Sequence, residues 1–157
     1  MMNVAVIGVG AMGCLFGAFL SPLANVTLLG HWPEQIAVLT REGLTLDGVD
    51  GRSTHHPIQA TNDPTAVPPT DLALILVKSR QTEQAAQRAR QILAPNGLAL
   101  TLQNGLGNLE KLTAVLGPNH AALGTTSQGA TMLQPGTVRH AGHGPTHLAY
   151  TPETRER

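Results

Sequence analysis

The first twenty residues carry the feature that most restricts the fold, an apolar segment that leads directly into a turn rich in glycine. Asn3–Ile7 has the length and apolar character of a buried strand, and Gly8, Gly10 and Gly13 follow it. We expect Gly8 to permit a tight turn, Gly10 to leave room for a ligand at the backbone, and Gly13 to let strand and helix pack closely. The helix that follows, residues 14–20, would present unpaired N–H groups and the positive end of its dipole to an anion.

A second apolar segment completes the unit that such a turn requires. Ser21-Pro22 ends the first helix, and Asn25–Leu29 then reads as another buried strand. Strand, turn, helix and strand together take about 30 residues, the length of a dinucleotide-binding β-α-β unit. A purely structural glycine turn is the alternative. The context favours a pyrophosphate site formed by the consecutive residues Gly8, Val9, Gly10, Ala11, Met12 and Gly13.

The rest of the chain alternates strand and helix patterns, which predicts an α/β fold. Leu72–Val77 is apolar without alternation, as in a parallel strand covered on both faces, and a helix with an alanine stripe follows it at 81–93. We predict a Rossmann-type, doubly wound parallel sheet, with a small antiparallel extension at the C-terminal end of the chain. Residues 1–150 would form one dinucleotide-binding domain, in which 127–150 are antiparallel edge hairpins, and residues 151–157 would be a polar tail.

Two polar residues follow strands whose carboxyl ends should meet at the ligand edge of the sheet. Lys78 comes directly after the strand 72–77, and Asn104 lies in a glycine loop after the strand 98–102. Ligands in such folds bind at that edge, so both side chains should converge with the glycine turn. The alternatives are a solvated strand end for Lys78 and simple turn formation for the Asn104-Gly105 pair.

The end of the second strand distinguishes the two nicotinamide cofactors. NAD sites usually carry a carboxylate there for the ribose 2′-hydroxyl, whereas this chain has Gly30-His31-Trp32 and no acid before Glu34. The pattern therefore favours NADP (NADPH) over NAD, with His31 hydrogen-bonded to the 2′-phosphate. A solvated loop residue is the alternative for His31. Three arginines are candidate helpers of unknown position: Arg41, Arg52 and Arg80.

Composition excludes several other classes of protein. Ten basic and ten acidic residues cancel, which argues against nucleic acid or an anionic membrane surface as partner.

Cys14 is the only cysteine, so no disulfide can form within the chain, and we expect its thiol to pack in the core. We expect no metal site, because His140, His143 and His147 would not share one face. We expect a cytoplasmic location, because no apolar run approaches the roughly 20 residues of a membrane span.

Several motifs, in this order and spacing, resemble the ketopantoate reductase (2-dehydropantoate 2-reductase) family. The resemblance covers nearly the whole chain, but only the N-terminal, NADP-binding half of the family. The segments that carry it are Gly8-Val9-Gly10-Ala11-Met12-Gly13, Leu76-Val77-Lys78-Ser79-Arg80-Gln81-Thr82, Gln103-Asn104-Gly105-Leu106-Gly107-Asn108, Leu123-Gly124-Thr125-Thr126 and Val138-Arg139-His140-Ala141-Gly142-His143-Gly144.

The resemblance implies specific roles for individual residues. It implies that Lys78 contacts the cofactor and approaches the substrate, and that Asn104 lies beside the nicotinamide ribose and the reacting centre. It places Ala130 where the family contacts the cofactor through its backbone. The family commonly has an arginine for the 2′-phosphate at the position of His31, and this chain departs from that pattern.

The resemblance also implies what a complete enzyme of this kind would need. Family members continue into a helical C-terminal domain that supplies the general-acid lysine and most substrate-binding residues, and we expect this chain to lack that domain. We therefore expect this chain to be the NADP(H)-binding part of an oxidoreductase that transfers hydride to the ketone of a small 2-keto acid such as ketopantoate. We assign no catalytic residue within this chain. A homodimer is a candidate assembly. The alternative is a non-catalytic NAD(P)-binding module, or a truncated remnant without reductase activity.

Overall fold

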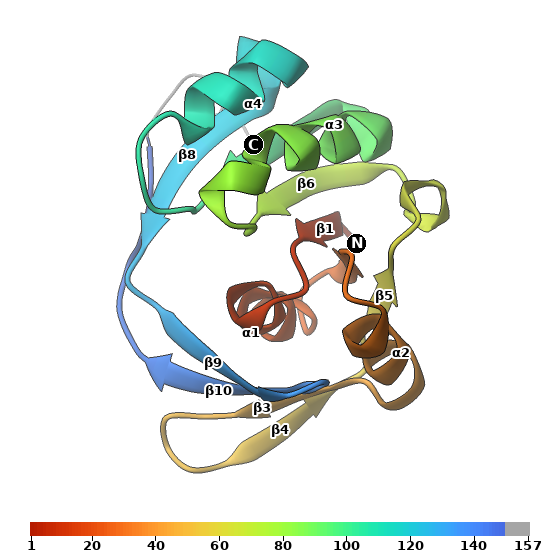
Figure 1. Cartoon of the computed structure of the whole chain (residues 1–157), viewed down its shortest axis with the longest axis vertical. Helices are drawn as coiled ribbons and strands as arrows, with labels where there is room; N and C mark the ends of the chain where they lie inside the picture. Colours follow the sequence, from red (N-terminus) through yellow and green to blue (C-terminus); the bar gives the residue numbers. More distant parts are fainter. Residues whose placement is uncertain (150–157) are drawn as a thin grey trace.

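The computed structural model describes residues 1–149 and consists of two sheets with helices around the larger one (Figure 1). The larger sheet has seven strands in the order β11-β8-β7-β6-β1-β2-β5, and the smaller has four in the order β4-β3-β10-β9. Only β11 is antiparallel to its neighbour in the larger sheet. The Rossmann-type α/β fold predicted from the sequence is thus confirmed. The predicted polar tail, 151–157, and Tyr150 lie outside the described residues.

The elements follow the predicted alternation along most of the chain. The larger sheet contains β1 (Asn3–Ile7), β2 (Asn25–Leu29), β5 (Gln59–Thr61), β6 (Thr70–Ile75), β7 (Leu93–Thr101), β8 (Ala121–Thr126) and β11 (Thr146–Leu148). The helices are α1 (Ala11–Leu20), α2 (Pro33–Glu42), α3 (Thr82–Ile92) and α4 (Asn108–Leu116), with short 3-10 turns at Pro64–Ala66, Ser79–Gln81 and Pro118–His120. The smaller sheet contains β3 (Leu44–Asp47), β4 (Ser53–His56), β9 (Gly129–Gln134) and β10 (Thr137–Gly142).

The central strand β1 has a separate core on each face, which explains its continuous apolar sequence. Val4 and Val6 belong to the core around α1, whereas Ala5 and Ile7 belong to the core around α3 and α4. Successive strand side chains point to opposite faces, so a strand between two cores has no polar positions. Figure 1 shows α3 and α4 on one side of the sheet and α1 on the other.

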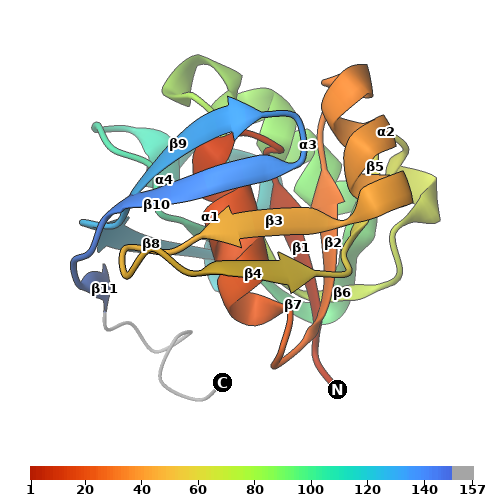
Figure 2. The same ribbon diagram turned by 90° about the horizontal axis from the view of Figure 1, so that it is seen from below.

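The antiparallel hairpin near the end of the chain is present, but it lies in a different place from the one expected. We predicted hairpins at 127–150 along the edge of the parallel sheet. Instead, β10 pairs in parallel with β3, with Val138 opposite Leu46, so the β9–β10 hairpin belongs to the smaller sheet. That sheet lies across α1 (Figure 2) and buries Val138, Leu46 and Leu44 against it. Only β11 extends the larger sheet, beside β8.

Burying α1 between two sheets explains why this helix is apolar on all sides. Its residues 13–18 are all buried, and a helix that is apolar all round is typical of a fully covered position. Among residues 1–149, no helix has both the length and the hydropathy needed to cross a membrane.

Gln35 is a buried polar residue that connects the smaller sheet to the glycine turn. It lies on α2 and is completely buried. Its Nε2 donates hydrogen bonds to the Val9 carbonyl oxygen and the Cys14 sulfur, each at 3.1 Å. Its Oε1 accepts from the backbone N–H of Gly136, in the β9–β10 turn, at 2.7 Å. One amide group thus satisfies polar atoms from three different segments.

We predict that Gln35→Leu destabilises the fold, because it leaves the Gly136 N–H and the Val9 carbonyl without this partner. A buried polar group that loses its partner costs about 1 to 3 kcal/mol, and urea unfolding measures the difference. Gln91→Leu, on the exposed side of α3, is the matched control and should change the free energy of unfolding by less than about 0.5 kcal/mol. Equal midpoints for the two variants would show that Gln35 does not contribute in this way.

Cys14 is inert in the folded protein because it is buried. Burial raises the pKa of its thiol from 9.0 to about 12, and the hydrogen bond from Gln35 opposes only part of that increase. In the unfolded chain the thiol ionises above pH 9.0, whereas the folded chain keeps it neutral up to about pH 12. Stability is therefore lost as the pH rises through this interval, because the unfolded state releases the proton first.

We predict that the free energy of unfolding of the native chain falls more steeply between pH 9 and pH 11 than that of Cys14→Ala. Chemical denaturation of both proteins across this range measures the difference between the slopes, so that other titrating groups cancel. Native Cys14 should also resist iodoacetamide at pH 9 and react once urea unfolds the chain. If the free energies of unfolding of the two proteins fell with pH at the same slope, or if iodoacetamide reacted rapidly with native Cys14, the assigned burial would be contradicted.

Candidate functional site

The glycine turn between β1 and α1 shows the three steric roles expected of its glycines. Gly8 has φ +128°, and a Cβ there would come within 2.7 Å of the Leu76 carbonyl oxygen. A Cβ on Gly13 would overlap the carbonyl oxygen of Gly8. Around Gly10, in contrast, a Cβ would meet no atom within 4 Å. The turn is therefore closed on its protein side and open at Gly10.

The open side of this turn presents the N-terminus of α1. Gly10 precedes the helix and has no side-chain cap, and the first turn contains no acidic residue. Cys14 donates the first intrahelical hydrogen bond, to Gly10, at 2.9 Å. The N–H groups of Ala11, Met12 and Gly13 come before it and have no intrahelical acceptor. Such a helix end attracts anions through both its donors and its dipole.

Two hollows flank the glycine turn and meet there. The first, of about 500 Å³, extends from Gly8–Gly10 along the end of β2 to α3, where Gln84 and Arg88 line it together with Gln81, the residue before the helix. The second, of about 530 Å³, extends from Gly10–Met12 to the loop after β7. The residues that both hollows share are Gly10, Leu76, Val77 and Lys78. An elongated molecule with one end in each hollow would have its middle at the turn.

The residues predicted for the site take several different positions in this cleft. Gly8, Val9 and His31 line the first hollow, Asn104 lines the second, and Lys78 lies between them. Gly13 is buried behind the turn. Ala130 lies on β9, where its backbone pairs with His140, and lines neither hollow. The roles of these residues in binding stay predictions.

The loop that carries Asn104 is held by a polar cluster, in which Gln103 and Asn108 are buried and Ser79 is exposed. Asn108 Nδ2 and Ser79 Oγ both donate to the Asn104 carbonyl oxygen, at 3.1 Å each. Gln103 Nε2 donates to the carbonyl of Val77, at the end of β6. The cluster thus joins the β7 loop to the segment that carries Lys78. The Asn104 side chain is exposed at the second hollow and has no hydrogen-bond partner among residues 1–149.

At the far end of the first hollow, an arginine from α3 contacts the end of β2. Arg88 Nη2 lies 3.0 Å from His31 Nδ1, and the guanidinium also reaches the carbonyl oxygens of Gly30 and Asn62, at 3.5 Å each. Because a guanidinium can only donate, His31 accepts at Nδ1 and carries its proton on Nε2. Burial, followed by the Arg88 charge, lowers the pKa of His31. Burial also lowers the pKa of Arg88.

Several lining residues were missed by sequence reasoning. Arg88 lines the first hollow, whereas Arg41, Arg52 and Arg80, the suggested helpers, line neither hollow. Gln128 lines the second hollow and is held by His140 Nε2 at 2.6 Å. The one available signal for the α3 residues was their spacing, because positions 84 and 88 lie on one face of a helix. The described part of either lining contains no carboxylate.

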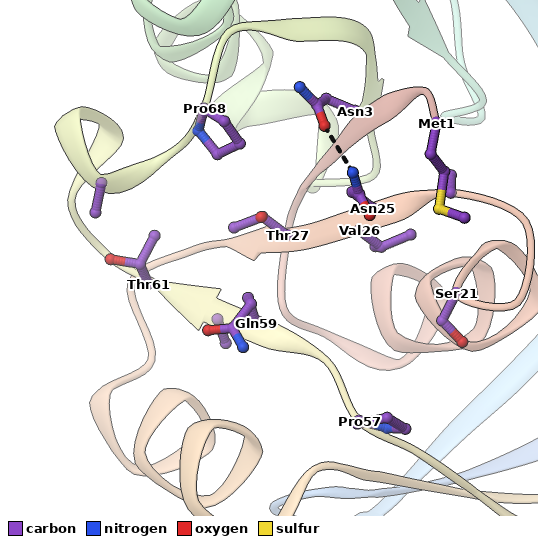
Figure 3. Close-up of a pocket in the computed structure, with 13 residues that line it drawn as sticks. Met1, Asn3, Ser21, Asn25, Val26, Thr27, Pro57, Gln59, Thr61 and Pro68 are labelled. Atoms are coloured by element: carbon purple, nitrogen blue, oxygen red, sulfur yellow. Dashed lines mark hydrogen bonds between the residues drawn. The ribbon is translucent and has the colours of Figure 1, made fainter.

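A larger hollow, of about 770 Å³, lies at the opposite end of the sheet (Figure 3). Asn3, Asn25 and Thr61 are among its lining residues, and the amide of Asn25 donates to that of Asn3 at 3.2 Å. The described lining has no charged side chain, and ligands of parallel α/β sheets bind at the other, carboxyl, end of the strands. The cleft at the glycine turn is therefore the candidate site. No group of three metal-binding side chains occurs in the described part of the chain.

Comparison with known proteins gives a consistent family. The family model described as "Ketopantoate reductase PanE/ApbA" matches residues 4–153. The 2-dehydropantoate 2-reductase of Halobacterium salinarum is 39% identical over 148 residues, which cover 94% of this chain and 48% of that protein. The enzyme of the same name from Pyrococcus horikoshii is 32% identical over 155 residues, covering 98% of this chain and 49% of that one.

Solved structures agree with these sequence matches. A PanE/ApbA family ketopantoate reductase from Ralstonia eutropha has a TM-score of 0.85 at 34% identity, covering 92% of this chain and 48% of that one. A D-mandelate dehydrogenase solved with NADH and anilino(oxo)acetate shares the fold, with a TM-score of 0.86 at 24% identity, over 98% of this chain and 51% of that one. The chain spans about half the length of the relatives it matches. With its family model matched from residue 4 to residue 153, this chain belongs to the ketopantoate reductase family.

Proposed function

We propose that this chain is the NADP(H)-binding domain of a 2-dehydropantoate 2-reductase-like oxidoreductase, and that residues 1–150 form that domain. The observation that carries the proposal is the pair of hollows that meet at the open face of Gly10. A dinucleotide has the matching form, two nucleoside ends joined by a diphosphate. The family membership and the names of the relatives support the same reading.

In the proposed pose, the diphosphate lies against the N-terminus of α1. The N–H groups of Ala11, Met12 and Gly13 would donate to its oxygens, and the helix dipole would favour its charge. The adenosine half would lie in the hollow that contains His31 and Trp32, and the nicotinamide half in the hollow that contains Asn104. Lys78, where the hollows join, would be close to both halves.

The charges around the first hollow favour NADP over NAD. NAD sites use a carboxylate at the end of the second strand to bind the ribose hydroxyls, and Glu34 does not line this hollow. The charged or ionisable side chains that do line it are His31, Lys78 and Arg88. A 2′-phosphate in this hollow would therefore not be repelled by a carboxylate of the lining.

We propose that the reaction is reduction of the ketone of a small 2-keto acid, such as ketopantoate. NADPH, when bound, supplies the hydride. Asn104 and Lys78 would then hold the ketone oxygen or carboxylate near the nicotinamide hollow. Reduction also needs a proton donor at the developing alkoxide, and we propose that a helical domain of the kind the family resemblance implies supplies it.

Gly10→Val should remove nucleotide binding without unfolding the protein. The valine side chain would occupy the open space at Gly10 and block the diphosphate, and it would meet no protein atom at its Cβ. Losing two or more charge-assisted hydrogen bonds corresponds to roughly a hundredfold weaker affinity, or more. Isothermal titration with NADPH and NADH measures the binding, and thermal unfolding measures the fold.

The contrasting variant is Gly13→Ala, in which the added Cβ overlaps the Gly8 carbonyl oxygen. This change should lower the melting temperature, which Gly10→Val leaves nearly unchanged. Unaltered NADPH affinity in a folded Gly10→Val protein would reject the proposed pose. Absence of binding by the unmodified chain would reject the proposed function itself.

A further inference from the structure

We propose that Arg88, on helix α3, is the residue that selects a 2′-phosphorylated adenosine, because it places a guanidinium at the end of β2 beside His31. The inference rests on the proposed dinucleotide function and deepens it, since it names the residue responsible for cofactor preference. The family resemblance implies an arginine at the position of His31. In this chain the same charge would come from a different element.

The first argument is position. Gln84 and Arg88, one turn apart on α3, line the first hollow together with Gln81 just before the helix, and Arg88 is the one that contacts Gly30 and His31. The end of the second strand is where this type of fold reads the 2′ substituent of the ribose, by an acid for NAD or by a nearby arginine for NADP. A guanidinium there faces the one group that distinguishes the two cofactors.

The second argument is the state of the guanidinium. Its three contacts are with uncharged acceptors, Gly30 O, Asn62 O and His31 Nδ1. The ion pairs found among residues 1–149 are Arg41–Glu42 and Arg52–Asp50, so Arg88 has no carboxylate partner in that range. Arg88 is also partly buried. A cation fixed in a hollow by neutral groups keeps its attraction for an incoming anion, because no internal anion competes.

The third argument is the fit of an arginine to phosphate. The planar fork of guanidinium donors can bind two oxygens of one phosphate at once. His31 accepts from Arg88 at Nδ1, so its remaining proton, on Nε2, is free to donate. Arg88 and His31 would then contact the same phosphate from two elements.

Among residues 1–149, the only other lysine or arginine that lines the first hollow is Lys78. Lys78 lies where the two hollows join, at the place expected for the diphosphate and the riboses. Arg80 precedes α3 and lines neither hollow. Arg90 is exposed on the same helix, two residues beyond Arg88, and lies outside the first hollow. Arg90 is therefore a matched control for charge and helix position.

The test compares Arg88→Gln with Arg90→Gln in the 157-residue chain. The probes are NADPH and NADH, together with 2′,5′-ADP and 5′-AMP, which isolate the adenosine end. Isothermal titration gives the affinities. Quenching of the single tryptophan, Trp32, gives an independent signal, because it lines the same hollow.

We expect Arg88→Gln to weaken NADPH and 2′,5′-ADP about tenfold to a hundredfold, the loss of one charge-assisted phosphate contact. The affinities for NADH and 5′-AMP should change by no more than about twofold, because neither molecule has a 2′-phosphate. A twofold change in affinity corresponds to about 0.4 kcal/mol of binding free energy. Arg90→Gln should match the unmodified chain with all four probes, and Arg88→Lys should recover part of the NADPH affinity.

Two results would overturn the inference while leaving the proposed function intact. One is unchanged NADPH affinity in Arg88→Gln. The other is an equal loss for NADPH and NADH, which would make Arg88 a structural support for the end of β2. If the unmodified chain binds neither dinucleotide, the proposed function itself fails, so the two failures are distinguishable.

Discussion

The close approach of two backbones at the glycine turn governs the geometry of the site. Gly13 on α1 lies against the Gly8 carbonyl, and Gly8 lies against Leu76, at the end of β6, so side chains are excluded from both positions. This contact brings the helix N-terminus directly over the ends of β1 and β6. Gly10 then lies where the two hollows join, and Ala11 and Met12, in the first turn of α1, line the second hollow. A side chain at Gly8 or Gly13 would therefore push the helix away from the strand ends.

Buried amide side chains hold the surroundings of the turn in place. Gln35 ties the turn to the smaller sheet through Val9 and Gly136. On the other side, Gln103 ties the Asn104 loop to the end of β6, and Asn108 ties it to the start of α4. Buried polar groups of this kind are costly unless fully paired, and among residues 1–149 no buried side-chain nitrogen or oxygen lacks a partner. The segments that line the cleft are thus held by buried side chains whose polar atoms all have partners.

The sequence predicted the parts of the fold that depend on local pattern. Val4–Ile7 and Leu72–Ile75 are apolar at every position because each strand faces two cores, and that pattern identified the central strands. The pairing of β10 with β3 could not be predicted, because alternation in Val138 and its neighbours shows which face is buried and does not show which strand lies alongside. For this reason the hairpins predicted at 127–150 were expected at the edge of the parallel sheet, whereas β9 and β10 lie in the smaller sheet.

The site was predictable to a similar extent. Lys78 and Asn104 follow strands, so the rule that ligands meet the carboxyl ends of strands placed them correctly at the cleft. Arg88 was missed because it lies at the boundary of the apolar stripe of α3, beside Ala85. A helical periodicity fixes the direction in which such a side chain leaves the helix, but it does not show that the end of β2 lies within reach of the guanidinium.

The most direct measurement of the central claim is a ¹H–¹⁵N NMR titration of the chain with NADPH. The account predicts that the backbone amide signals of Ala11, Met12 and Gly13 shift most strongly, together with the indole N–H signal of Trp32. Shifts concentrated at Asn3 and Asn25, the first residues of β1 and β2, which line the hollow at the opposite end of these strands, with the α1 amides unmoved, would contradict it.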